Sequence, residues 1–188
     1  MIRARVYLVL LLSWPALRAG AQTPEPDLTA VKAKTDLSEE DRSAIRAFVS
    51  KRVDALRAKD EAAAQQNAAD LRSTADGTDA FKKAYAAVCV EAIGAAYKQA
   101  EVTSAARLLT LLNGLNSTEA LPILLEALQD DRVGVRAAAA LGLRALREKL
   151  AAAGRDTYQK ALSALKEAGK REKSRSTLTL VYTAMNYA

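Results

Sequence analysis

The sequence predicts an all-α fold, and three observations lead to that class. The chain of 188 residues contains only 8 glycines and 4 prolines. Alanine, leucine, arginine, lysine and glutamate, which favour helices, dominate its composition. Apolar residues recur at helical spacing, and residues that begin or end helices separate these stretches. We therefore expect a series of helices and no β-sheet.

The first 21 residues predict a secretory signal peptide. Arg3 and Arg5 form its basic start, residues 6–12 its apolar core, and residues 19–21 a small-residue cleavage motif before Gln22. The apolar core is shorter than the about 20 residues that a transmembrane helix needs, and no later segment is suited to span a membrane. An uncleaved N-terminal anchor is the alternative interpretation. The pattern predicts an exported protein, either periplasmic or secreted.

A flexible leader is predicted to follow the cleavage site over residues 22–37. Pro24 and Pro26 interrupt this stretch, which carries several charges and little periodic apolar content. From residue 38 onward the apolar spacing becomes helical, so we expect a helical N-terminal region over residues 38–100.

The helical N-terminal region contains three predicted helices. Ser38 can cap the first, over residues 38–58, and the second covers residues 60–74 with few large apolar side chains. Thr78 can cap the third, over residues 78–100. Apolar stripes are predicted on the first helix (Ile45, Phe48, Val49, Val53 and Leu56) and on the third (Phe81, Tyr85, Val88, Cys89, Ile93 and Tyr97). The stripe on the third helix is wide enough to predict neighbours on two sides.

Residues 101–188 contain shorter predicted helices with tighter links. A helix over residues 103–112 is expected to end at Asn113 and Gly114, and Ser117 can cap the next helix. Gly154 ends a later helix. Two final helices follow, one with Tyr158, Ala161, Leu162 and Leu165 on one face, and one that runs through Leu178, Leu180, Val181, Tyr182 and Met185.

The clearest unit in the chain covers residues 120–146 and predicts two amphipathic helices joined by an acidic turn. Its first helix carries leucines three and four positions apart, and its second helix is rich in alanine. Asp130 and Asp131 occupy the turn, and Val135 and Arg136 lead into the second helix. This order of features resembles a HEAT repeat of the short bacterial, phycobilisome-lyase-like kind.

The resemblance implies a right-handed α-solenoid-like array of antiparallel helix pairs over residues 101–188, with the region before it as a helical extension. It assigns structural roles in the repeat to Asp130, Asp131, Val135 and Arg136. Asp131 and Arg136 are similar to the turn and ladder residues that form bonds within and between repeats. For Arg136, contact with an anion is the alternative role. The neighbouring units match the repeat less clearly, so the expected period is irregular.

Charge is unevenly distributed along the chain. The formal net charge is +6, yet residues 131–188 contain 12 basic and 5 acidic residues, whereas residues 22–130 are acidic overall. The basic end is expected either to be a solvated surface or to favour an acidic protein, a polyanion or an anionic lipid. Nucleic acid is not an expected partner, because almost no aromatic residue lies among the basic ones.

The sequence does not predict an enzyme, a cofactor or a metal site. Histidine is absent, which removes the commonest general base and most zinc sites. No glycine-rich phosphate loop is found. The single cysteine, Cys89, lies among apolar residues and is expected to be a small buried hydrophobe. A reactive or intermolecularly paired thiol is the alternative.

The function expected from these features is that of an exported, non-catalytic scaffold whose concave surface binds another protein. The resemblance implies this role through the fold alone. The alternative is a structural or surface-binding module whose basic C-terminal half binds an anionic polymer or a membrane surface. For the apolar last helix three interpretations stay open: it packs fully on the preceding pair, it supports self-association, or the chain has been cut short.

Overall fold

The computed structural model describes residues 26–58, 60–115 and 117–186. The predicted signal peptide, residues 1–21, and the first part of the predicted leader lie outside the described residues. The described residues form helices joined by short links and contain no β-strand, so the prediction of an all-α fold is confirmed. The helices are α1 (Thr29–Lys32), α2 (Glu39–Leu56), α3 (Glu61–Thr74), α4 (Asp79–Gln99), α5 (Val102–Leu115), the 3-10 helix η1 (Thr118–Ala120), α6 (Leu121–Ala127), α7 (Val133–Ala152), α8 (Arg155–Arg171) and α9 (Arg175–Met185).

Local capping signals explain where several helices begin. Ser38 accepts a hydrogen bond from the backbone N–H of Asp41, whose carboxylate accepts one from the backbone N–H of Ser38, so α2 begins with a capping box. Thr78 caps α4 in the same position, as predicted. Asp60 and Ser174 cap α3 and α9. Each cap satisfies a backbone donor that the first helical turn leaves free.

The predicted leader, residues 22–37, requires a correction in its described part. Leu28, Val31 and Leu37 are buried in the core. Val31 lies within α1, Leu28 directly precedes this helix, and Leu37 follows it. The backbone N–H of Thr78 donates to the carbonyl of Lys32 at 3.0 Å, which ties this segment to the start of α4. Among the described residues, the core therefore includes side chains from Leu28 onward. These three apolar side chains hold the segment in place because they are part of the hydrophobic core.

The linker between α3 and α4 passes very close to α1. Gly77 has a φ of +155°, and a Cβ atom at this position would lie 2.9 Å from the carbonyl oxygen of Lys32. A side chain would collide with backbone at this distance, so glycine permits the contact.

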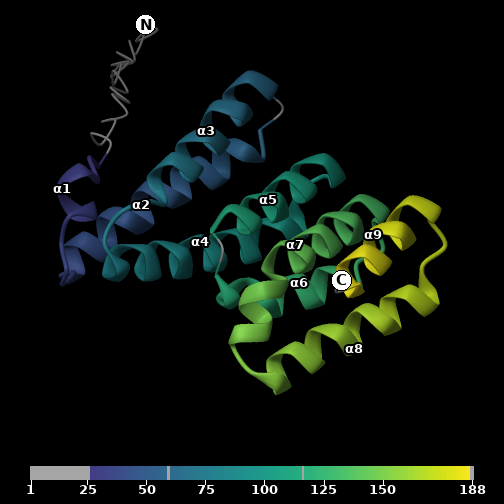
Figure 1. Ribbon diagram of the computed structural model, residues 1–188. Helices are drawn as coiled ribbons and strands as arrows, with labels where there is room; N and C mark the ends of the chain where they lie inside the picture. The colour runs from purple at the N-terminus through teal and green to yellow at the C-terminus, as the bar shows by residue number, and fades with distance from the viewer. Residues whose placement is uncertain (1–25, 59, 116, 187–188) are drawn as a thin grey trace, which may run out of the picture.

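Each helix from α2 onward packs against a helix next to it in the chain, and several also pack against the helix two places away. Helix α2 contacts α3 and α4, α4 contacts α5, α5 contacts α7, and α7 contacts α6, α8 and α9. Figure 1 shows α5, α7 and α9 side by side, with α8 along the outer edge of this group. One continuous hydrophobic core runs from Leu28 to Ala184, so it crosses the boundary predicted near residue 100.

One predicted helix end differs from the structure. Helix α5 continues through Asn113 and Gly114 to Leu115, because Leu115 packs against the core and offsets the small cost of a glycine near the helix end. In α9, Val181 and Ala184 are buried while Tyr182 is 52% exposed, so the buried face of the last helix is narrow.

Candidate functional site

The turn between α6 and α7 contains the four residues singled out in the sequence. Val135 is fully buried at the start of α7. The carboxylate of Asp130 accepts a hydrogen bond from the backbone N–H of Arg132 at 2.8 Å, which closes a local turn of the kind that aspartate favours. The carboxylate of Asp131 forms no hydrogen bond with a described residue. The carboxylate that holds the turn therefore belongs to Asp130 and not, as expected, to Asp131.

Arg136 connects this turn to the link between α8 and α9. Its Nη1 donates to the backbone carbonyls of Asp130 at 2.9 Å and Asp131 at 2.8 Å. Its Nε and Nη2 donate to the two carboxylate oxygens of Glu172, at 2.7 and 3.0 Å. The paired geometry is the strong, bidentate form of an arginine–carboxylate contact. One guanidinium thus joins the turn between α6 and α7 to the link between α8 and α9.

Arg132 makes the corresponding connection in the other direction. Its guanidinium donates to the carbonyls of Tyr97 and Ala100 at the C-terminal end of α4. Nε and Nη2 also donate to the carboxylate of Asp130, each at 2.8 Å. Sequence reasoning missed Arg132, because its partners in α4 lie more than 30 positions earlier. The only local signal was its place two residues after Asp130.

These contacts form a continuous series that we call the arginine ladder: Arg132, Asp130, Arg136 and Glu172. Glu172 is its most enclosed carboxylate, with a side chain that is 2% exposed. The adjacent Arg136 guanidinium lowers the pKa of Glu172 from 4.5 to about 2, because its hydrogen bonds outweigh the cost of burial. Arg132 likewise lowers the pKa of Asp130. The ladder is therefore fully ionised at neutral pH.

The arginine ladder has the properties of a structural element. All four hydrogen bonds of Arg136 and all four side-chain hydrogen bonds of Arg132 go to backbone carbonyls or to the carboxylates of Glu172 and Asp130. Little of either guanidinium is left to bind an external anion. The geometry favours a structural role for Arg136 over the alternative of an anion contact.

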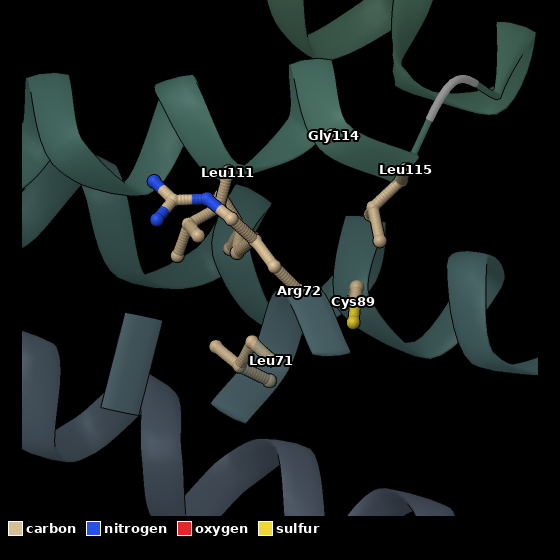
Figure 2. A pocket seen from close by; sticks show the side chains of 7 residues that line it. Leu71, Arg72, Cys89, Leu111, Gly114 and Leu115 are labelled. Carbon is tan, nitrogen blue, oxygen red and sulfur yellow. The ribbon is translucent and has the colours of Figure 1, made fainter. Parts of the chain in front are cut away.

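Cys89 is buried in the core and lines a small cavity. Burial raises the pKa of its thiol to about 12, so the reactive thiolate is not formed at neutral pH. Figure 2 shows the residues that line this cavity between α3, α4 and α5, among them Leu71, Leu111 and Leu115. The cavity measures about 10 Å³, which is the space of roughly one water molecule. The expectation of a buried, hydrophobe-like cysteine is confirmed.

An open hollow lies on the outer surface of α5 and α7. It is lined by Asn113 from α5 and by Leu141, Arg144, Ala145, Arg147 and Glu148 from α7, and its volume is about 460 Å³. Leu141 is 38% exposed and is one of the exposed large apolar side chains of the described residues, together with Val102, Val133 and Tyr182. We call this surface the α7 hollow.

Gly142 follows Leu141 in α7 and lies close to α5 and α6. A Cβ atom at this position would lie 2.7 Å from the side chains of both Asn113 and Leu124. Glycine therefore lets α7 approach α5 and α6 closely, and it leaves the neighbouring Leu141 pointing outward.

Within the described residues, no group of histidine, cysteine, aspartate and glutamate side chains is arranged to hold a metal ion. In the same part of the chain, none of the helices has the length and apolarity needed to cross a membrane. Comparisons with protein-family models, curated proteins and solved structures give no match. The assignment to HEAT repeats therefore stays a prediction.

Proposed function

We propose that this protein is an exported, non-catalytic helical-repeat scaffold that binds another protein. Its helices are assigned to a HEAT-like α-solenoid in which α4–α5, α6–α7 and α8–α9 are successive antiparallel pairs. Two features support this assignment. Helices α5, α7 and α9 pack on one another in succession, and the arginine ladder links each pair to the next. The proposal of export rests on the signal-peptide pattern of residues 1–21.

The observation that carries the proposed binding function is the exposure of Leu141 in the α7 hollow. An apolar side chain in a concavity, with Arg144 and Glu148 beside it, has the arrangement of a protein interface with an apolar centre and a polar rim. The hollow lies on α7, which packs against α5, α6, α8 and α9. These contacts hold the surface of α7 in a fixed position. We infer that a partner inserts an apolar side chain beside Leu141.

The test is affinity capture from an extract of the cell envelope with wild-type protein and two variants. Leu141→Gln changes the α7 hollow, and Val133→Gln changes a side chain of similar exposure, 45%, at the start of the same helix. We expect one defined protein to be recovered at both low and high salt, and to be lost only with Leu141→Gln. Apolar contacts are little screened by salt, whereas exposed charge pairs are. Equal recovery with both variants would contradict the proposal.

A second candidate function is binding of an anionic polymer or membrane surface through α8. Lys160 and Lys166 are exposed on its outer face and form no ion pair within the described residues, while the apolar side chains Ala161 and Leu165 are buried. Such a helix can attract anions, but its apolar face is buried in the protein and is not available to insert into a bilayer. Retention through α8 should therefore fall steeply with salt and should be weakened by Lys160→Gln/Lys166→Gln.

A further inference from the structure

A second cleft lies near the C-terminal end of α7, at the opposite end of this helix from the arginine ladder. It has a volume of about 500 Å³ and lies between α4, the end of α5, residues 117–119 and α7. Lys149 of α7 is 13 residues beyond Arg136, which corresponds to roughly 20 Å along the helix axis. The cleft is thus a separate surface from the ladder and belongs to the size range of ligand sites.

Lysine side chains dominate the charge of this cleft. Lys82 and Lys83 come from α4 and Lys149 from α7, so the fold brings together cations that are 66 residues apart in the chain. Glu119 is the one carboxylate that lines the cleft among the described residues. Lys82 lies 3.7 Å from Asp76, whereas Lys83 and Lys149 form no ion pair within the described part of the chain. Two cations at this concave surface therefore lack an anionic partner.

The remaining lining is partly apolar and partly hydroxylic. Leu115 and Ala86 supply apolar surface, and Ser117 and Thr118 supply hydroxyl groups. Lysine is a compact point charge suited to single carboxylates, and no glycine-rich loop or arginine is present in the described lining to cradle a phosphate in a bidentate way. The concave shape favours a protruding peptide segment over a flat bilayer.

The lysines also lie near the C-terminal end of α5, which has no basic residue in its own last turn. Cations stabilise the negative end of a helix dipole, so the same lysines could act on stability alone. That role predicts a loss of stability when their charge is removed, and no change in binding. The two roles can therefore be separated by experiment.

We propose that this cleft binds an acidic segment of a partner protein, with carboxylates beside Lys83 and Lys149 and a small apolar side chain against Leu115. This inference rests on the proposed scaffold function and adds the chemical class of a partner. Its lining shares no residue with that of the adjoining α7 hollow, so variants of Lys83 and Lys149 test the cleft and Leu141→Gln tests the hollow.

The test uses a fluorescent, glutamate-rich peptide with one central leucine, measured by anisotropy at about 50 mM and about 300 mM NaCl. We expect binding at the lower salt concentration. Lys83→Gln/Lys149→Gln should weaken it by about five- to tenfold, as the loss of two favourable charge contacts. Lys160→Gln/Lys166→Gln removes the same charge from the outer face of α8 and should change it less than about twofold. Lys83→Arg/Lys149→Arg should retain most of the binding.

Several results would overturn the inference. The first is that the peptide does not bind at low salt, and the second is that the cleft variant and the α8 variant weaken peptide binding equally. The third is that the cleft variant binds the peptide as the wild type does but is less stable in urea. Binding to phosphatidylglycerol vesicles that depends on Lys83 and Lys149 as strongly as peptide binding does would assign the cleft to a membrane instead. Leu141→Gln should leave peptide binding unchanged, so a failure here is distinguishable from a failure of the scaffold proposal.

Discussion

Replacing Glu172 with glutamine should weaken the connection between the α6–α7 turn and the α8–α9 link in a pH-dependent manner. Glu172→Gln preserves the size of the side chain but removes the charge that faces Arg136, at 2.7 and 3.0 Å. The pKa of Glu172 is lowered from 4.5 to about 2 in the folded protein. This difference corresponds to about 3 kcal/mol of stability at neutral pH.

The sign of the pH effect follows from the lowered pKa. The folded state holds the ionised carboxylate, so its contribution is fully present above about pH 4.5 and is lost as the pH falls toward 2. By pH 3 about 2 kcal/mol of it should be gone. Glutamine does not titrate, so the variant lacks this part of the pH dependence.

Urea unfolding followed by circular dichroism at pH 7 and pH 3 provides the assay. The free energy of unfolding of Glu172→Gln should lie below that of the wild type by about 3 kcal/mol at pH 7, and the gap should shrink by about 2 kcal/mol at pH 3. Measuring the gap cancels the titration of the other carboxylates. A gap of the same size at both pH values would refute the reasoning, because the ionised pair would then not be the source of the stability.

The remaining predictions concern Arg132, Gly142 and Cys89. Arg132→Ala should lower the free energy of unfolding by about 1–3 kcal/mol, since it leaves carbonyls of α4 without donors, whereas the exposed Arg144→Ala should change it by less than about 0.5 kcal/mol. Gly142→Ala should cost about 1–3 kcal/mol in the same urea assay, because its methyl group meets the side chains of α5 and α6; an unchanged midpoint would contradict the close approach. A thiol reagent should label Cys89 only after unfolding, and rapid labelling of the native protein would contradict its burial.

The helices could be predicted because their signals are local. Ser38 and Thr78 act on backbone groups three residues away, and the apolar spacing of α2 and α4 lies within single helices. Residues 26–37 were misjudged for the opposite reason. Their apolar side chains are buried only through contacts with helices that come later in the chain.

The same distinction applies to the candidate sites. Arg136 was identified by its place in a recognisable unit, but its partner Glu172 is 36 residues away and gave no local signal. The cleft that contains Lys83 and Lys149 was not predicted from the sequence. These lysines come together only when α4 and α7 lie on either side of the end of α5. Of the two turn aspartates, only the three-dimensional path of the backbone decides that Asp130 makes the bonds.

A photo-crosslinking residue in place of Leu141 tests the central claim, that the helical array presents the α7 hollow to a partner protein. The control places the same residue at Val133, which has similar exposure on the same helix. We expect one defined crosslinked protein from position 141 and none from position 133. No crosslinked protein at position 141, or the same products from both positions, would contradict it.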